Sequence, residues 1–231
     1  MDLDLTPFII LDVETTGLKV AEGDRVCEIG AIRVQGGKET GRFESLVNPQ
    51  RSIPEEAQRI HNVSDEMVKG SPKWEEVGPK FRPFLAGGVI VAQNADFDMG
   101  FLNSEYAGIG MAKLAQPVVD TISLARRVRP GLATYKLDSL AHHFGVTNRS
   151  RHRSIGDCEV TVKIFQECLV ALRRRGEVRS IDAKEPLGKA VNLPHSLIMQ
   201  SGEYCFFNQP FTCSDPGLYR FVKPQVCNAQ H

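Results

Sequence analysis

Asp12 and Glu14 close an otherwise apolar run, residues 8–11, near the start of the chain. The β-branched and large apolar side chains of this run predict a buried strand, in which residues i and i+2 point to the same face. The two carboxylates therefore meet on one side of the strand. Adjacent acids at the end of a buried strand repel each other unless a cation neutralises them, which makes this pair a candidate metal site. A solvated strand end is the simpler interpretation of such a pair in isolation.

A further carboxylate, Asp98, follows a second short apolar run, residues 88–92. It lies where a strand is expected to turn into a helix, at the carboxyl edge where open α/β sheets generally place ligands. Asp96, two residues earlier, is explained equally well as a helix cap. Asp98 is therefore the better candidate ligand.

His152 and Asp157 form the third group. Asp157 is expected to open the longest helical pattern, residues 157–175, and His152 lies in the loop before it, between two arginines. Histidine is the side chain that most readily exchanges a proton near neutral pH, which suits a general base. Alternatively, His152 is a solvent-facing loop histidine, and Asp157 is an acid favoured at a helix start by the macrodipole.

Hydrophobic periodicity predicts the elements that must position these groups. Apolar runs indicate strands, and apolar faces with helical spacing indicate helices. Together they predict an α/β fold, with a mixed five-stranded sheet flanked by helices. The strands are expected at residues 8–14, 27–34, 42–47, 88–92 and 118–119, and the main helices at residues 74–85, 97–106, 120–128, 137–144 and 157–175.

Composition limits the class of protein. With 231 residues, 42% of them hydrophobic, the chain fits one large domain, or one medium domain with an appendage. Its net charge of zero gives no overall attraction to nucleic acid, so a polyanion would have to meet local charge. Six scattered cysteines without a CxxC pair argue against a zinc framework. The sequence shows neither a signal-like segment nor a membrane-spanning run, so we expect a soluble cytoplasmic protein that does not contact a membrane.

The sequence pattern changes after residue 175. Helical periodicity fades there, and prolines recur at positions 186, 194, 210, 216 and 224. We therefore expect residues 1–175 to form the main domain. Residues 176–231 are expected to form an irregular C-terminal extension that packs on the domain or contacts a partner.

The three acidic groups occur in the order and context of the exonuclease motifs, and residues 5–175 resemble the DEDDh, or DnaQ-like, exonuclease family. This family includes proofreading subunits and domains of DNA polymerase III. Each segment is a weak signal alone, whereas the ordered set is rarely accidental. Gln93 departs from the histidine that the family often has there, and Ser154, Ile155 and Cys158 replace the usual Ala, Leu and Ala. The matching segments are residues 12–17, 60–67, 94–98, 119–121, 135–141 and 152–157.

The resemblance implies an RNase H-like fold and a two-metal mechanism for 3′–5′ removal of nucleoside monophosphates. Two Mg²⁺ or Mn²⁺ ions, typically about 3.5–4 Å apart, would be held by four carboxylates, and a histidine would take the proton from the attacking water. The implied metal ligands and catalytic residues are Asp12, Glu14, Asp98 and Asp157, with His152 as the base. By the same resemblance, the terminal nucleotide would meet Thr15, Thr16, Gly17, His61 and Phe97. For Phe97, ordinary helix core is an equal alternative, and His61 could instead cap a neighbouring turn.

The expected partner is a nucleic-acid 3′ end. Residues 126–153 contain seven positively charged side chains against one carboxylate, which suits phosphate binding, although a solvated face is the alternative. Single-stranded or frayed DNA is favoured, with attachment to a DNA polymerase subunit through residues 176–231. A stand-alone exoribonuclease that trims RNA remains open, because nothing in the sequence decides how a 2′-hydroxyl is treated. An inactive nuclease fold kept as a binding module is the third alternative, and an intact set of repelling carboxylates argues against it.

Overall fold

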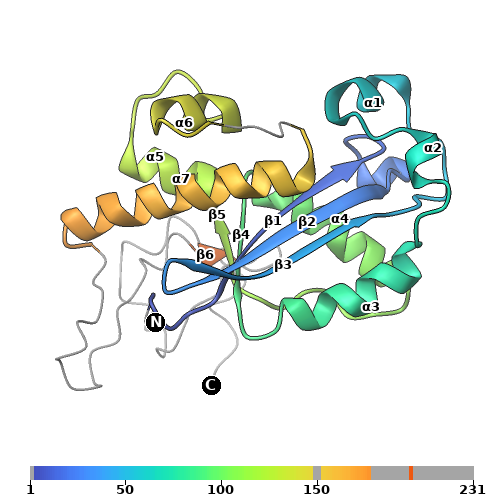
Figure 1. Ribbon diagram of the computed structural model, residues 1–231, viewed down its shortest axis with the longest axis horizontal. Helices are drawn as coiled ribbons and strands as arrows, with labels where there is room; N and C mark the ends of the chain where they lie inside the picture. The colour runs from blue at the N-terminus through green and yellow to red at the C-terminus, as the bar shows by residue number, and fades with distance from the viewer. Residues whose placement is uncertain (1–2, 148–151, 178–197, 200–231) are drawn as a thin grey trace, which may run out of the picture.

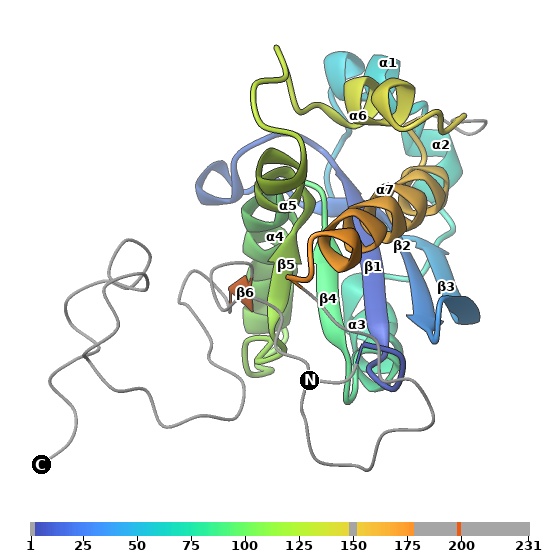
Figure 2. The same cartoon turned by 90° about the vertical axis from the view of Figure 1, so that its left-hand side faces the viewer.

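The computed structural model describes residues 3–147, 152–177 and 198–199. Its centre is a mixed sheet with the strand order β3-β2-β1-β4-β5-β6 (Figures 1 and 2). The first five strands in the chain confirm the predicted five-stranded sheet. The short strand β6 (Ile198–Met199), which belongs to the expected extension, pairs antiparallel with β5. The five are β1 (Phe8–Thr15), β2 (Val26–Gln35), β3 (Lys38–Leu46), β4 (Val89–Ala92) and β5 (Val118–Asp120).

Strand direction changes at β1. The β1–β2 and β2–β3 pairs are antiparallel, whereas β1–β4 and β4–β5 are parallel. Gly36 and Gly37 join β2 to β3 with φ angles of 57° and 75°, which glycine adopts without a Cβ clash and which suit a tight hairpin. β3 begins at Lys38, four residues before the predicted strand. Its first half is exposed at the sheet edge, so apolar periodicity could not reveal it.

Helices cover both faces of the sheet. α5 (Thr121–Val128), α6 (Leu137–His143) and α7 (Ser154–Arg174) pack on one face, and α3 (Trp74–Phe84) and α4 (Ala95–Gly108) pack on the other. Figure 1 shows α7 running across the strands. Within the part of the chain that the structure describes, no helix has the length and apolar character needed to cross a bilayer.

Three short helical elements complete the fold near the carboxyl end of β1. They are η1 (Val20–Glu22), α1 (Glu55–His61) and α2 (Asp65–Val68). Figure 1 shows α1 and α2 beyond the end of this strand. They therefore border the edge of the sheet where the sequence places Asp12 and Glu14.

Alternation along β1 decides which side chains face which layer. Phe8 and Ile10 belong to the core beneath α5, α6 and α7, whereas Ile9 and Leu11 belong to the core beneath α3 and α4. Continuing the alternation, Asp12 and Glu14 face the α7 side, because successive residues of a strand point to opposite faces.

A glycine in β2 lets α7 approach the sheet closely. Gly30 pairs with Asp12, and a Cβ built at Gly30 would lie 2.6 Å from the amide nitrogen of Ile155. Any larger residue would push the start of α7 away from the strands. The first turn of α7 therefore lies directly over the strand pair that contains Asp12.

The predicted main helices are all present, but α7 begins at Ser154, three residues before the predicted start at Asp157. The earlier start of α7 has a physical cause. The amide of Ser154 donates to Glu28 Oε2 of β2 at 3.0 Å, so the helix start is capped from a strand and needs no acid of its own there. Asp157 lies one turn inside the helix and is buried.

Candidate active site

Asp12 and Glu14 of β1 and Asp157 of α7 form one carboxylate cluster. Each offers an oxygen, and these three oxygens all lie within 4.8 Å of one another. The strand periodicity brings the first two together, and the close approach of α7 at Gly30 brings the third. The structure thus unites residues that lie 145 positions apart in the chain.

Asp98 lies beside this cluster at the start of α4. Its Oδ1 accepts a hydrogen bond from the Val13 amide at 3.1 Å, and the residue is only 2% exposed. The pairing between β1 and β4 covers Phe8 to Ile10 only, so the Val13 amide lies beyond the β4 ladder and Asp98 satisfies it instead. Asp96 is exposed on the same helical turn, which agrees with the choice of Asp98 over Asp96.

The cluster strongly disfavours negative charge. Burial raises the pKa of Asp12 well above its ordinary range, and Asp98, Glu14 and Asp157 raise it further by repulsion. Burial, followed by repulsion from Asp157, raises the pKa of Glu14 to about 8. Burial also raises the pKa of Asp98 to about 8, against the opposing hydrogen bond from Val13. Positive charge placed among these acids would therefore be strongly favoured.

The donor set fits a hard divalent cation. The three clustered residues offer carboxylate oxygens alone, which suits Mg²⁺ or Mn²⁺ and does not suit a metal that prefers sulfur ligands. Asp98 is held at the rim of the same group by the Val13 amide. Asp12, Glu14 and Asp157 are therefore chemically able to hold a divalent cation, and Asp98 lies near enough to Asp12 to interact with its charge.

His152 lies two residues before the start of α7, partly buried. Its φ of 57° falls in the left-handed region, which is uncommon for a residue other than glycine. Burial is the main cause that lowers the pKa of His61, and repulsion from His152 lowers it further by a small amount. The structure thus places His152 beside the helix turn that leads to Asp157.

All five predicted substrate-binding residues line one cleft of about 380 Å³. Glu14 of the carboxylate cluster lines it too, so the cleft opens directly onto the candidate metal site. Leu18 and Ile60 add exposed apolar surface, with 79% and 57% of their areas accessible. The five predicted residues are Thr15, Thr16, Gly17, His61 and Phe97.

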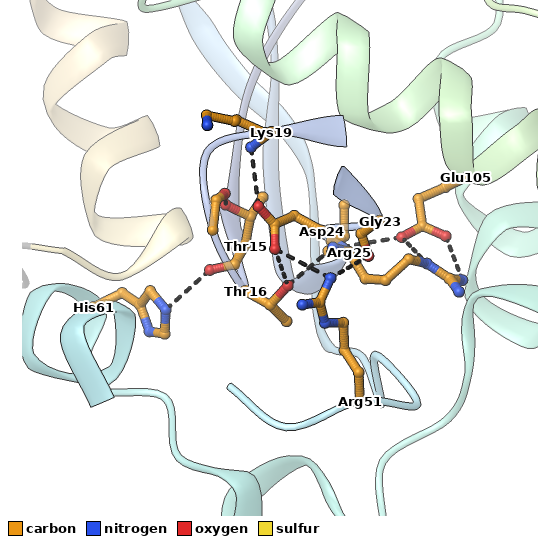
Figure 3. A network of polar contacts seen from close by, with 11 residues as sticks. Thr15, Thr16, Lys19, Gly23, Asp24, Arg25, Arg51, His61 and Glu105 are labelled. Atoms are coloured by element: carbon orange, nitrogen blue, oxygen red, sulfur yellow. Dashed lines mark hydrogen bonds and ion pairs between the residues drawn. The ribbon is translucent and has the colours of Figure 1, made fainter. Parts of the chain in front are cut away.

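The loop after β1 is held by a polar network around Asp24, drawn in Figure 3. Asp24 accepts hydrogen bonds from the Thr16 hydroxyl at 3.2 Å and from the Lys19 amide at 3.0 Å, and it pairs with Arg51 at 3.1 Å. A Cβ at Gly17 would lie 2.3 Å from an Asp24 oxygen. The glycine is therefore required for the loop to fold back onto Asp24, and the network fixes one wall of the cleft.

His61 and Phe97 serve the scaffold as well as the cleft. The His61 Nδ1 accepts from the Val63 amide at 3.0 Å, which leaves Nε2 to donate to the Thr15 carbonyl at 3.3 Å (Figure 3). The first contact closes the turn after α1, as the capping alternative predicted. Phe97 packs against Phe101 with ring centroids 4.9 Å apart, as expected for a residue of the helix core. His61 and Phe97 thus each have a structural contact in addition to their place in the cleft.

Glu28 is a site residue that the sequence reasoning missed. It lies opposite Glu14 in the β1–β2 pair and is fully buried. Its carboxylate accepts from Arg153 Nε at 2.9 and 3.1 Å and from the Ser154 amide. One signal was available: Glu28 is the only charged residue in the otherwise apolar stretch from Val26 to Ile32.

Two of the chain's departures from the expected motifs, Gln93 and Cys158, make hydrogen bonds within the scaffold. Gln93 donates from Nε2 to the Tyr135 carbonyl at 2.8 Å and accepts from the Thr121 hydroxyl, which ties β4 to the segment before α6. The Cys158 thiol donates to the Gly30 carbonyl at 3.4 Å. Neither substitution displaces a carboxylate of the cluster.

A mixed sheet with helices on both faces carries a carboxylate cluster at the end of its central strand, an arrangement that suits metal-assisted hydrolysis. Residues 9–165 match the family model described as Exonuclease, and the chain belongs to this family. The motif residues and structural neighbours place it among the DnaQ-like exonucleases.

Relatives and a solved structure agree with this assignment. DNA polymerase III subunit epsilon of Treponema pallidum is 40% identical over 160 residues, which cover 68% of this chain and 74% of the relative. The DNA polymerase III PolC-type of Pediococcus pentosaceus is 40% identical over 154 residues, 67% of this chain but only 11% of the relative. Exonuclease X in complex with 5′ overhanging duplex DNA superposes with a TM-score of 0.59 at 26% identity, covering 73% of this chain and 93% of the other.

The chain is much shorter than several of its relatives. It spans between 11% and 25% of the length of three proteins of the DNA polymerase III class that it matches. The family match at residues 9–165 covers most of the sheet and its helices and includes the whole carboxylate cluster.

Proposed function

We propose that this protein is a divalent-metal-dependent 3′–5′ exonuclease that releases nucleoside monophosphates from DNA 3′ ends. The observation that supports this most strongly is the meeting of Asp12, Glu14 and Asp157 within 4.8 Å, with Asp98 hydrogen-bonded beside them. One of these acids, Glu14, lines a cleft that is open to solvent. A scaffold without catalysis would gain nothing from carboxylates that raise one another's pKa.

Two Mg²⁺ or Mn²⁺ ions would be held by Asp12, Glu14, Asp98 and Asp157. When bound, such ions neutralise the phosphodiester and lower the pKa of water. His152 accepts the proton of the attacking water on its imidazole ring. The water oxygen forms a bond to the terminal phosphorus, and the bond from that phosphorus to the preceding nucleotide's O3′ breaks. The departing O3′ takes up a proton from solvent water. The products are a nucleoside 5′-monophosphate and a strand one nucleotide shorter with a new 3′-hydroxyl.

The cleft beside Glu14 takes the terminal nucleotide. Its volume of about 380 Å³ falls within the range of about 300–1,000 Å³ typical of small-ligand sites. The exposed apolar side chains of Leu18 and Ile60 suit stacking or packing against any base, because every base has an apolar face. Thr15 and Thr16 form a polar wall of the cleft, and their hydroxyls are held within the loop by the Gly17 carbonyl and by Asp24. Such a cleft accepts the end of a strand without selecting a base.

Single-stranded or frayed DNA is the proposed substrate. That it is DNA is supported by the names of the polymerase III relatives and by Exonuclease X, which was solved on 5′ overhanging duplex DNA. Positive charge supports phosphate binding: Arg126, Arg129 and Lys136 are exposed on α5 and in the segment leading to α6. Arg127 is partly neutralised by its ion pair with Glu177.

We also propose that residues 176–231 contact a partner such as a DNA polymerase subunit, as part of proofreading. The support is the name of the relatives and the position of β6 at the sheet edge, where the extension adds to β5. Outside β6 and the first two residues after position 175, this segment lies outside the described residues. A pull-down with the polymerase III core subunits, using the full chain and a chain ending at residue 177, tests this attachment.

The activity is tested with 5′-labelled single-stranded DNA and RNA of the same sequence, in Mg²⁺, in Mn²⁺ and in EDTA. We expect a ladder of products shortened from the 3′ end of DNA, with metal only. Asp12→Ala should abolish the ladder, whereas Asp96→Ala should keep it, because Asp96 is an exposed acid outside the cluster. A ladder from RNA alone would assign an exoribonuclease instead. Failure to shorten either strand in either metal would favour a binding module.

A further inference from the structure

Glu28 of β2 is a buried carboxylate, and among the described residues its hydrogen bonds come from the start of α7. Arg153 donates to it from Nε at 2.9 and 3.1 Å and from a terminal guanidinium nitrogen, and the Ser154 amide donates at 3.0 Å. Glu28 is 0% exposed. A buried carboxylate is tolerated only when its oxygens are satisfied by charged or strong donors, and a forked arginine with a backbone amide meets that need.

The same contacts supply what α7 lacks at its own start. The N-cap residue of α7 is Arg153, and its side chain makes no capping hydrogen bond. The first amides of a helix have no partner within the helix, and negative charge near them is stabilising. Glu28 therefore caps α7 from a strand 125 positions away and fixes where the helix begins.

Two functional groups flank this anchored turn. His152 directly precedes Arg153, and Asp157 follows Ser154 by three residues, with its amide bonded to the Arg153 carbonyl at 2.9 Å. On the other side of the contact, Glu28 lies opposite Glu14 in the β1–β2 pair. One ion pair thus joins the strand pair that holds Glu14 to the turn that holds both His152 and Asp157.

We propose that Glu28 and Arg153 are positioning residues that set the place of His152 and Asp157 relative to Asp12 and Glu14. The proposal rests on the exonuclease function proposed above. Breaking the pair frees the first turn of α7, so the base and one metal ligand lose their fixed distance from β1. Binding of the nucleic-acid strand in the cleft does not depend on this turn, so the defect is in turnover and in metal affinity.

The test variants are Glu28→Gln and Arg153→Lys. Glutamine keeps the shape of Glu28 but removes the charge, and lysine keeps the charge of Arg153 but removes the fork. The chain offers a matched control in Arg25 and Glu105, which are also drawn in Figure 3. Glu105 accepts hydrogen bonds from the Arg25 guanidinium at 2.9 and 2.7 Å and from the Val26 amide at 3.0 Å. These are the same kinds of donor that bind Glu28, but this pair joins β2 to α4. Glu105→Gln therefore reports the general cost of losing a buried ion pair.

For Glu28→Gln and Arg153→Lys we expect kcat to fall about 10–100-fold, the usual effect of losing a residue that orients a metal ligand. KM should stay within about threefold. The affinity for Mn²⁺, measured by calorimetry without nucleic acid, should weaken by about tenfold. Glu105→Gln should lower the unfolding temperature to a similar extent as Glu28→Gln while leaving kcat and Mn²⁺ affinity close to those of the parent chain.

A double-mutant cycle separates positioning from general destabilisation. Glu28→Gln should reduce kcat much less in a His152→Ala chain than in the parent chain, because the base it positions is already gone. If Glu28→Gln lowers kcat equally in both chains, Glu28 does not position His152. If Glu28→Gln leaves the Mn²⁺ affinity unchanged, Glu28 does not position Asp157. If Glu28→Gln does not fold, Arg153→Lys gives the same comparison. A parent chain that shortens no strand would overturn the proposed function, while the calorimetry would still decide the positioning of Asp157.

Discussion

Asp98 accepts a hydrogen bond from the backbone amide of Val13, 85 positions earlier in the chain, at 3.1 Å. Val13 separates Asp12 from Glu14, so this contact ties the start of α4 to the strand segment that holds both acids. The geometry explains how a helix on one side of the sheet contributes to a cluster formed on the other. It also makes Asp98 a residue with two roles, as a strand partner and as a candidate metal ligand.

Replacing Asp98 should therefore abolish activity even where the fold survives. We expect Asp98→Asn, which keeps a hydrogen-bond acceptor for Val13, to lower kcat by at least about 100–1,000-fold, the range seen when one charge-stabilising group is removed from an active site. Asp96→Asn, one exposed position on the same turn, should stay within about twofold. Steady-state kinetics on labelled DNA would measure both, and equal activity of the two variants would contradict the assignment.

The raised pKa of Glu14 predicts how pH affects the metal-free protein. Its pKa is about 8 in the folded chain against an ordinary value of 4.5, so the folded state binds more protons between these values. Stability therefore falls as pH rises from about 4.5 to 8, and the loss is complete above pH 8.

Glu14→Gln removes that loss. In EDTA at pH 8.5 we expect its unfolding temperature to exceed that of the parent chain by about 3 °C, the shift produced by about 1 kcal/mol in a chain of this size. The difference should disappear near pH 4.5. Glu167→Gln, an exposed position on α7, should show no such trend. A variant less stable than the parent at pH 8.5 would mean that the charge of Glu14 is compensated without metal.

His152→Ala should lower kcat by about 100-fold or more, since general base catalysis contributes about 10²–10⁴-fold. Mn²⁺ affinity should change little, because the metal ligands remain. His142→Ala, an exposed histidine at the end of α6, is the matched control and should be neutral. The measurement is single-turnover cleavage with saturating enzyme, which isolates the chemical step. Full activity of His152→Ala would remove this residue from the mechanism.

Gly17→Ala should damage the cleft rather than the metal site. A Cβ there would overlap Asp24, which holds the loop, so the wall that meets the terminal nucleotide must shift. We expect KM to rise about tenfold, because small displacements of binding groups have large kinetic effects. Gly70→Ala, where a Cβ has open space, should leave KM unchanged. Unaltered KM in Gly17→Ala would show that this loop does not contact the substrate.

Much of the fold and of the site could be predicted because the signals are local. The alternation in β1 puts Asp12 beside Glu14, and the strand-to-helix turn favours Asp98. The order of the motifs then links them to Asp157. The structure brings these four residues together at one end of the sheet, as the sequence reasoning expected.

What the sequence did not reveal depends on contacts between distant segments. The Glu28–Arg153 pair joins positions 125 apart, and only the paired strands show that Glu28 lies opposite Glu14. The bond from the Ser154 amide to Glu28 also explains why α7 begins before the predicted start at Asp157. A cap supplied by a distant strand leaves no signal in the sequence next to the helix. The close approach at Gly30 is likewise visible only once α7 lies on the sheet.

Anomalous scattering from a crystal of the protein soaked with Mn²⁺ and a nucleoside 5′-monophosphate would locate the metal ions themselves. We expect two manganese peaks among the carboxylates of Asp12, Glu14, Asp98 and Asp157, with the nucleotide in the cleft lined by Thr15 and His61. An Asp12→Ala crystal treated in the same way should lose at least one peak. Fully occupied manganese elsewhere, with none at these carboxylates, would show that they are not the catalytic metal site.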